Sequence, residues 1–212
     1  MDNPLIIIYQ LAVLIFSVMI HEISHGVIAL KLGDPTAKNA GRLTLNPLKH
    51  LDPVGSLLLP LFLFFVGGPI FGWAKPVPYN PFNLKNQKKG AGLIGAAGPL
   101  SNLLVAIVFG IFLRILAPLA VQESFAALTV LFQFIVIINI ALAVFNLIPL
   151  PPLDGANILF ALLPKKYYLL HHFLARYGFY VIIFLIAFGG FSFITPIIKV
   201  LYYLIAGGGI RF

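Results

Sequence analysis

The sequence of 212 residues contains no cysteine and few charged residues. Without cysteine, the chain can form no disulfide bond and offers neither a thiolate metal ligand nor a cysteine nucleophile. Charged residues make up 9% of the chain and hydrophobic residues 60%, whereas about a quarter of the residues in a soluble domain are charged. This composition, with a mean hydropathy of +1.02, excludes an ordinary soluble domain and predicts an integral membrane protein.

Acidic residues are also scarce, and the net charge is +8. The basic residues lie in short segments between apolar runs, where they set membrane topology beside anionic lipid, so we expect the lipid bilayer and not nucleic acid as a partner. Several apolar runs reach the roughly 20 residues that a spanning helix needs. We therefore expect one polytopic, all-α membrane domain over residues 1–212, with a core at about 5–163 and one or more C-terminal membrane segments at about 178–207.

The first apolar run holds the motif His21-Glu22-Ile23-Ser24-His25. Residues four apart project from the same face of a helix, so the two histidines can bind one metal ion. Glu22 follows the first histidine directly, a position that suits a general base acting on a water at the metal. No residue from Pro4 to Ile20 is charged, and ionisable groups in such a segment indicate function. The alternative is a set of polar residues satisfied inside a helix bundle.

A catalytic zinc ion takes three protein ligands and a water, so one more ligand must come from elsewhere. Asp154 follows several prolines that unwind the end of an apolar segment, and unwound backbone at membrane depth is tolerated only where it is buried or lines a wet cavity. It is our predicted third ligand, the alternative being an aspartate that caps a helix beginning near Gly155. His50, His171 and His172 compete for this role, but they lie in basic loops and are expected to be interfacial.

The order of apolar and polar residues predicts the elements before the second spanning helix. The first helix covers about 5–32 and ends at Gly33-Asp34-Pro35. Polar and apolar residues alternate over 41–46, which predicts a short strand. Glycines and prolines interrupt the apolar segment 53–73, which either spans or re-enters. We therefore expect a small β or re-entrant element between the first and second spanning helices.

Further helices are predicted at about 91–116 and 125–147, followed by a short amphipathic stretch that continues to Leu163. The first of these opens with small residues that permit close helix contact. The last apolar region, 178–207, contains Gly189, Gly190 and Pro196, which are expected to break a helix, and the sequence leaves open whether the region crosses once or folds back.

One metal bound by both His25 and Asp154 also constrains the topology. Each residue lies near the C-terminal end of its apolar segment, so the two helices must run in the same direction and an odd number of crossings must separate them. Of the two intervening segments, 53–73 is therefore predicted not to span. In this topology 11 of the 14 basic residues lie on one side of the membrane, and the exceptions are Arg114, Lys199 and Arg211. By the positive-inside rule we expect this side to be cytoplasmic, with the metal nearer to it, in a multi-pass protein of the plasma membrane.

These motifs resemble the site-2 protease family of intramembrane zinc metalloproteases, in its compact bacterial and archaeal branch. The resemblance covers about 11–163 and rests on the histidine motif, on Gly95-Ala96-Ala97-Gly98-Pro99, on Asn146 through Asp154-Gly155, and on Gly72 through Pro78. It implies one zinc ion per chain on His21, His25 and Asp154, with Glu22 activating the water and Asn146 holding the substrate or the developing oxyanion. The sequence shows neither the inserted PDZ domain nor the appended CBS-type regulatory domain of larger relatives.

We therefore expect a zinc metalloendopeptidase that hydrolyses peptide bonds of membrane-spanning protein substrates, as in regulated intramembrane proteolysis. A substrate helix must unwind before cleavage, and either the predicted strand or the segment 75–79 could pair with it by strand addition. The candidate substrate-binding residues are Arg42, Leu43, Thr44, Leu45, Asn46, Lys75, Pro76 and Val77. Two alternatives are a membrane transporter for zinc or protons, since ionisable residues in membrane helices also mark ion pathways, and a catalytically silent relative that binds transmembrane helices.

Overall fold

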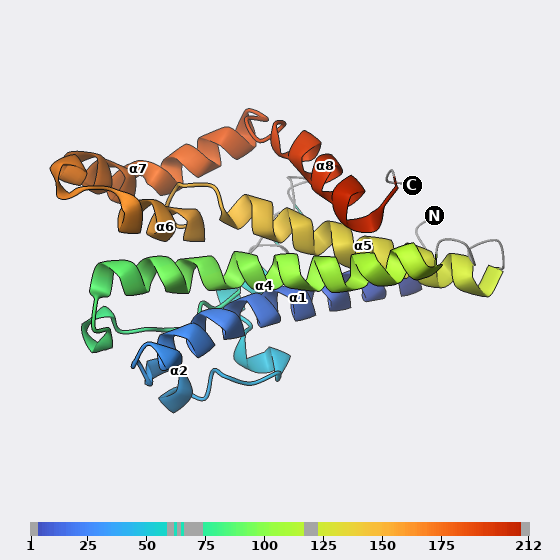
Figure 1. The fold of residues 1–212 in the computed structure, drawn as a ribbon, viewed down its shortest axis with the longest axis horizontal. Coiled ribbons are helices and arrows are strands. Elements are labelled where there is room, and N and C mark those ends of the chain that lie inside the picture. The colour runs from blue at the N-terminus through green and yellow to red at the C-terminus, as the bar shows by residue number, and fades with distance from the viewer. Residues whose placement is uncertain (1–3, 59–61, 63–64, 66–73, 117–122, 209–212) are drawn as a thin grey trace.

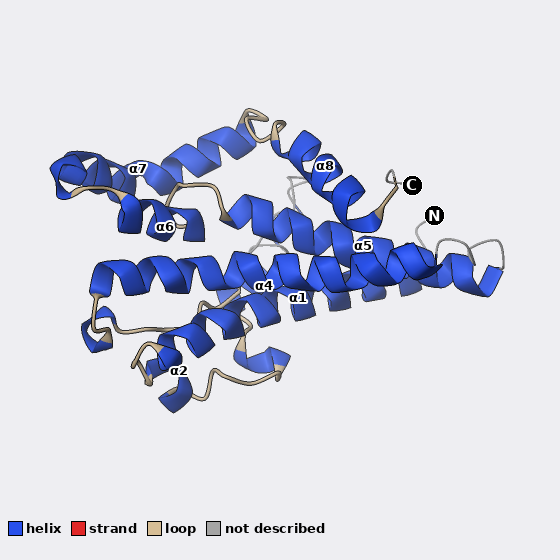
Figure 2. Ribbon diagram, in the orientation of Figure 1, coloured by secondary structure: helices blue, strands red, loops and turns tan. Residues whose placement is uncertain are grey.

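The computed structural model describes residues 4–58, 62, 65, 74–116 and 123–208, which form helices, turns and loops (Figure 2). The α-helices are α1 (Pro4–Lys31), α2 (Thr36–Asn39), α4 (Gln87–Leu116), α5 (Glu123–Asn146), α6 (Asp154–Leu162), α7 (Tyr168–Ala187) and α8 (Ile194–Ala206). The shorter helical turns are η1 (Pro47–Lys49), η2 (Pro53–Leu58), η3 (Pro81–Asn83) and η5 (Lys165–Tyr167). The all-helical class predicted from the sequence is confirmed for these residues.

Among the described residues, four helices are long and apolar enough to cross a membrane, over Leu5–Lys31, Gln87–Leu116, Ala127–Asn146 and Leu169–Ala187. Their outer faces carry exposed apolar side chains, which water would not solvate but lipid does. On α1 and α4 these include Leu5, Ile8, Leu11, Phe16, Leu100, Leu104, Ile107 and Ile111. The chain is therefore a multi-pass integral membrane protein.

Local sequence signals define the ends of these helices. The chain leaves α1 through Gly33, whose φ of 104° is a conformation that favours glycine, followed by Asp34 and Pro35. At the start of α4 the Asn86 side chain accepts a hydrogen bond from the backbone N–H of Lys89, 3.0 Å away, as an N-cap does. The predicted helix boundaries near 32 and 91 are thus close to those observed.

Helices α1 and α5 run in the same direction, and α4 lies against both and runs the opposite way (Figure 1). A buried apolar cluster joins α4, α5 and α8 and contains Ala106, Leu113, Val136, Ile140 and Tyr202. The parallel arrangement of α1 and α5 is the one that the predicted metal site requires. It brings the C-terminal half of α1 to the same end of the bundle as the end of α5.

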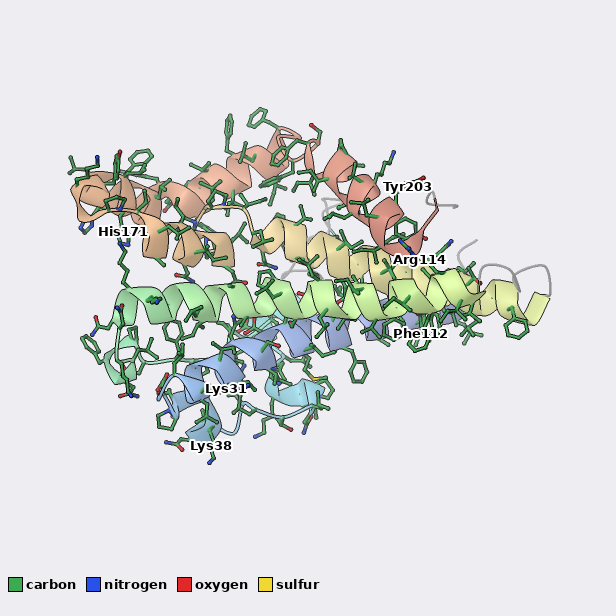
Figure 3. All side chains as sticks on the ribbon, in the orientation of Figure 1. Lys31, Lys38, Phe112, Arg114, His171 and Tyr203 are labelled. Atoms are coloured by element: carbon green, nitrogen blue, oxygen red, sulfur yellow. The ribbon has the colours of Figure 1, made fainter. Side chains whose placement is uncertain are left out.

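The C-terminal apolar region forms two helices, α7 and α8, with a break that includes Gly189 at a φ of 67°. Helix α8 packs on α4 and α5, and its own C-terminal carbonyls accept hydrogen bonds from Arg114. The Arg114 Nε donates to the carbonyl oxygen of Ile205 at 2.9 Å, and its Nη2 donates to that of Leu204. Arg114 therefore lies far along the bundle from Lys31 and Lys38, which are found beside α2 (Figure 3).

The strand predicted over 41–46 is wrong, because these residues form turns and bends. The alternating pattern placed Arg42 on a polar outer face, yet its side chain is buried and its Nη2 donates to the Lys75 carbonyl oxygen at 2.6 Å. Leu43 also packs inward, against Gly26 of α1. Since neighbouring residues both contact the protein, the period of two does not describe an edge with one solvated face. Most of the segment 53–73 lies outside the described residues.

A buried carboxylate fastens the end of α1 to the loop before α4. Asp34 is fully buried and accepts hydrogen bonds from the backbone N–H and hydroxyl of Thr36, the backbone N–H of Asn80 and the side-chain amide of Asn83, at 2.5–3.1 Å. Burial raises the pKa of the Asp34 carboxyl, but the hydrogen bonds from Thr36, Asn83 and Asn80 lower it by more, so this pKa lies below its usual value. Asp34 thereby holds the extended segment 74–80 beside α1.

Candidate metal centre

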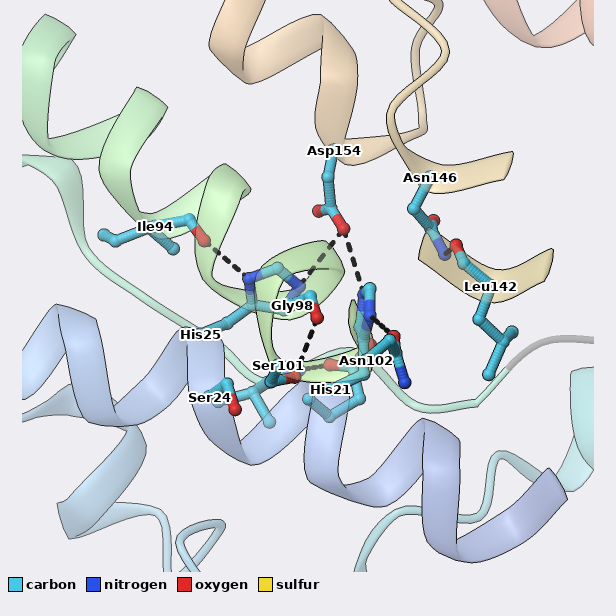
Figure 4. Close-up of polar contacts among 12 residues, drawn as sticks. His21, Ser24, His25, Ile94, Gly98, Ser101, Asn102, Leu142, Asn146 and Asp154 are labelled. Carbon is cyan, nitrogen blue, oxygen red and sulfur yellow. Dashed lines mark hydrogen bonds and ion pairs between the residues drawn. The ribbon is translucent and has the colours of Figure 1, made fainter. Parts of the chain in front are cut away.

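Three side chains from α1 and α6 converge at the end of the bundle (Figure 4). His21 and His25 are buried on one face of α1, and Asp154 is the first residue of α6. The Asp154 Oδ2 atom lies 3.0 Å from the Nε2 atom of His21 and 3.3 Å from the Nε2 atom of His25. Each residue offers one ligand atom, and the three atoms lie within 4.8 Å of one another. The structure thus brings the three predicted ligands together.

The turn before α6 aims the Asp154 carboxylate at the histidines. Leu153 is the N-cap residue of α6, and no side-chain hydrogen bond caps this helix. The alternative role of Asp154 as a capping residue is therefore not what the structure shows. Gly155 lies so close to the end of α5 that a Cβ atom there would be 2.3 Å from the carbonyl oxygen of Leu147. A larger residue would push α6, and Asp154 with it, away from the histidines.

The small residues of α4 make room for the site. A Cβ atom on Gly98 would be 2.5 Å from the Nε2 atoms of both histidines. A Cβ atom on Gly95 would be 2.8 Å from the Asn157 side chain, and one on Gly92 would be 2.4 Å from Ala161. The close helix contact predicted from these small residues is confirmed, since it lets α1 and α6 approach α4 from different sides.

Hydrogen bonds at the far ring nitrogens orient both imidazoles. The His21 Nδ1 atom lies 2.6 Å from the Asn102 Oδ1 atom, and the His25 Nδ1 atom lies 2.7 Å from the backbone carbonyl oxygen of Ile94. Both partners are oxygens that can only accept, so each Nδ1 carries a proton and each neutral imidazole presents a lone pair at Nε2. Ligands of zinc are commonly held in this way by a second set of contacts.

These lone pairs explain why the site fits a cation. The Asp154 Oδ2 atom is buried, and among the described residues its polar contacts are the two imidazole Nε2 atoms. It faces the two Nε2 atoms at 3.0 and 3.3 Å, so three atoms that can each offer a lone pair converge on one point, where a metal cation would be bound. Two imidazoles and one carboxylate are a ligand set of catalytic zinc, which keeps its fourth position open. The residues present therefore fit zinc.

Glu22 does not belong to the ligand group. Its Oε2 atom accepts a hydrogen bond from the backbone N–H of Val77 at 2.7 Å. Val77 is buried in the extended segment 74–80, where its side chain lies close to Gly26. The loop before α4 thus fixes the position of the Glu22 carboxylate.

Asn146 lies on the last turn of α5, across the turn from Asp154 (Figure 4). Its side-chain nitrogen donates to the Leu142 carbonyl oxygen of its own helix at 2.9 Å. One of its two N–H groups is therefore used within the helix, and the other has no partner among the described residues.

The predicted substrate-binding residues are largely bonded to one another and to the core. The carbonyl oxygen of Lys75 accepts from Arg42, and the N–H of Lys75 donates to the His50 carbonyl oxygen at 2.9 Å. The Thr44 carbonyl oxygen lies 2.9 Å from the His50 Nε2 atom, and the Asn46 side chain caps η1. These contacts fix the loop 41–50 against the segment 74–80.

None of the competing histidines reaches the metal group within the described residues. His50 is buried in the loop described above. His171 stacks on Phe160 with ring centroids 4.1 Å apart, and His172 follows it on α7.

Sequence reasoning missed part of the surroundings of the site. Asn102 was not among the predicted site residues, and its side chain bonds to a metal ligand. Ser17 and Asn139 were not singled out, although both are buried next to Asn102. A signal for Ser17 was available, because it lies four residues before His21 on the same face of a charge-free helix.

Comparisons with known proteins agree with this geometry. The profile of Peptidase family M50 matches residues 115–189, which include Asp154. The chain is 46% identical over 160 residues to "Putative zinc metalloprotease YwhC" of Bacillus subtilis, which covers 74% of this chain and 69% of the relative. It is 29% identical over 171 residues to "Zinc metalloprotease MJ0392" of Methanocaldococcus jannaschii, or 79% of this chain and 38% of that relative.

It is also 30% identical over 139 residues to "Putative zinc metalloprotease Rip2" of Mycobacterium tuberculosis, where the match covers 66% of this chain and 51% of the relative. The chain thus spans about half the length of that relative. No solved structure matches the chain significantly.

The metal site makes a direct prediction about zinc content. The protein purified in detergent should hold one zinc ion per chain. Asp154→Ala should weaken zinc binding by more than about 100-fold, because even changes behind the ligands cost 10–100-fold. Titration with a competing chelator, followed by metal analysis, measures this.

His50→Ala is the matched control, since it removes a buried imidazole that lies outside the ligand group. Zinc binding that does not depend on Asp154, or that depends equally on His50, would contradict the assignment.

Proposed function

Because the chain belongs to peptidase family M50, the site-2 protease family, we propose that this zinc metalloprotease cleaves membrane-spanning proteins within the bilayer. The observation that carries the proposal is the depth of the ligands. His25 and His21 lie six and ten residues before the end of α1 at Lys31, which at 1.5 Å per residue is about 9–15 Å inside the helix end. A site at this depth is accessible to a substrate segment that is itself in the membrane.

A bound zinc ion supplies Lewis-acid polarisation of a carbonyl and lowers the pKa of a bound water. The chain supplies the groups that move protons and bind charge. Glu22 is the general base in this proposal: the Val77 N–H holds its Oε2 atom, and among the described residues no hydrogen bond reaches its Oε1 atom. The fixed carboxylate can accept a proton at Oε1 and later pass it to the leaving amine.

Asn146 is the proposed donor to the negative charge that develops on the substrate carbonyl oxygen. One N–H of its amide is fixed on Leu142, which orients the side chain, and no described residue accepts from the second N–H, which can donate to a substrate. Fixed donors of this kind stabilise a transition state because they need no reorganisation during the reaction.

The extended segment 74–80 is the proposed contact for the unwound substrate. Its Lys75 and Val77 N–H groups are already bonded, and Pro76 and Pro78 have none. Its carbonyl oxygens at Pro76 and Val77 receive no hydrogen bond from the described residues and can accept from a substrate strand. This favours the segment 75–79 over the loop 41–46, which forms no strand.

The positions of the basic residues support a cytoplasmic location for this end of the protein. Lys31 ends α1 and Lys38 lies in the following helix α2 (Figure 3), and Lys85, Lys88 and Lys89 lie at or just before the start of α4. By the positive-inside rule we propose that these ends face the cytoplasm, with the chain in the plasma membrane and membrane-spanning proteins as its substrates.

The role of Glu22 predicts the behaviour of Glu22→Gln. This variant should bind zinc as the unaltered protein does, and its amide oxygen can still accept from Val77. Cleavage of a membrane-spanning substrate should fall by about 10²–10⁴-fold, the usual contribution of a general base. Turnover in reconstituted liposomes and metal content of the same preparation are the two measurements. Retained turnover with zinc bound would remove Glu22 as the base, and absence of cleavage by the unaltered protein would contradict the proposed function itself.

Asn146→Ala tests the oxyanion role. Loss of one donor should lower kcat by about 10²–10³-fold and leave KM and zinc content unchanged, because the contact forms only in the transition state. If KM rises while kcat stays constant, Asn146 holds the substrate in the ground state, and its assignment to the oxyanion is wrong.

Cross-linking tests the substrate segment, and the absence of cysteine makes every introduced thiol unique. In the Glu22→Gln background, Pro76→Cys should form a disulfide with a single cysteine placed near the scissile bond of a membrane-spanning substrate. Phe82→Cys, at an 84% exposed residue outside the segment, is the control and should not react above background. Cross-linking through Leu45→Cys in place of Pro76→Cys would show that the substrate follows the loop 41–46.

A further inference from the structure

A connected group of buried polar side chains continues from His21 into the membrane-spanning part of the bundle. It consists of Ser17 on α1, Asn102 on α4 and Asn139 on α5, and both asparagines are fully buried. Buried amides in an apolar helix bundle are costly unless every hydrogen-bonding group has a partner. This group meets that condition by bonding to itself, to two backbone carbonyls and to a metal ligand.

The orientation of the Asn102 amide follows from its contacts. Its Nδ2 atom lies 3.2 Å from the backbone carbonyl oxygen of Ser17 and 2.8 Å from the Asn139 Oδ1 atom. A carbonyl oxygen can only accept, so the atom that faces Ser17 must be the NH₂ group. The other atom, Oδ1, is then the one that faces His21 at 2.6 Å.

Asn139 is fixed in the same manner. Its Nδ2 atom donates to the Ile135 carbonyl oxygen at 2.9 Å and to the Ser17 hydroxyl oxygen at 2.9 Å. Its Oδ1 atom is therefore left to accept from Asn102. Neither amide can rotate by 180° without placing an oxygen against a carbonyl oxygen, so the network has one direction.

We propose that Ser17, Asn102 and Asn139 are positioning residues that hold His21 in the tautomer with the proton on Nδ1, and that they raise the affinity of the site for zinc by doing so. In water an imidazole exchanges its proton between both nitrogens. Here the Asn102 oxygen accepts only from a protonated Nδ1, which leaves the Nε2 lone pair directed at Asp154 and the metal.

The two histidines differ in how this selection is made. A backbone carbonyl, that of Ile94, fixes the His25 tautomer, and no side-chain substitution removes it. His21 depends on a side chain that is itself held by α1 and α5. The packing of α1, α4 and α5 around Ser17, Asn102 and Asn139 therefore affects zinc affinity through the orientation of His21, and His25 is not part of this network.

The inference requires the zinc site but not any particular substrate, so it is tested by metal affinity and not by proteolysis. Asn102→Leu has a similar volume and removes the acceptor. It should weaken zinc binding by about 10–100-fold, the range found for changes in the partners of metal-binding histidines. Asn102→Ala is made alongside it, so that the test does not depend on how one side chain fits. The measurement is chelator competition on protein whose folding has been checked by thermal unfolding without metal.

Two further variants separate positioning from packing. Ser101→Ala changes the neighbouring residue of α4 and loses one hydrogen bond, to Gly98 of the same helix, so it should leave zinc affinity unchanged. Asn102→Asp keeps an oxygen that accepts from Nδ1 but places its second oxygen against the Ser17 carbonyl oxygen and the Asn139 Oδ1 atom, so it should lose less zinc affinity than Asn102→Leu without reaching that of the unaltered protein. Nitrogen-15 NMR of histidine-labelled, metal-free protein should show a protonated Nδ1 at His21 in the unaltered chain and a mixture of tautomers in Asn102→Leu, with His21→Gln assigning the signal.

Undiminished zinc affinity in Asn102→Leu and Asn102→Ala would overturn the proposal. So would equal losses in Asn102→Leu and Asn102→Asp, because they would show that the network contributes only to the fold. A His21 tautomer that does not respond to Asn102→Leu would overturn it as well. Each of these results can be obtained whether or not the protein cleaves a given substrate, so failure of this inference is distinguishable from failure of the proposed function.

Discussion

The convergence of three electron-pair donors at one point is the constraint on which the rest of the structure depends. The Nε2 atoms of His21 and His25 lie 3.0 and 3.3 Å from the Oδ2 atom of Asp154, and the three atoms are placed as the ligands of one cation are. To bring these atoms together, α1 and α5 must run in parallel and end at the same side of the bundle. Helix α4 must then return between them.

That return helix has to pass close to the metal centre, which accounts for its composition. At Gly98 the imidazoles occupy the space of a Cβ atom, and at Gly95 and Gly92 the helix α6 does so. On the face toward the site these two turns of α4 therefore carry only glycines, which allow the helices to approach closely. Four residues beyond Gly98, Asn102 uses the same proximity to reach His21 with an amide oxygen. On α4, Gly98 thus makes room for the His21 ring and Asn102 bonds to it.

Most of the metal site could be predicted from the sequence because ionisable residues are rare in this apolar chain. Two histidines four residues apart in a charge-free helix restrict the choice, and few acidic residues remain to complete the site, of which only Asp154 follows a proline-broken helix end. The prediction of a strand over 41–46 was wrong. It assumed that alternating polar and apolar residues face solvent and protein in turn, whereas the neighbours Arg42 and Leu43 both contact other parts of the protein. Ser17, Asn102 and Asn139 are separated by up to 122 residues, and their association depends on helix packing that no local pattern contains.

The ligands and the proposed base are positioned by different parts of the molecule. Helix packing and buried amides hold the histidines, whereas Glu22 is held by the backbone N–H of Val77 in the loop before α4. That loop is itself fastened to the end of α1 by Asp34, through Asn80 and Asn83. Since Asp34 lies beyond the spanning segment and the amides lie within it, the candidate ligands and the proposed base are held by separate sets of contacts. The same loop carries the free carbonyls proposed to meet the substrate, so substrate pairing and placement of the base act on one segment while the metal ligands stay fixed by the helices.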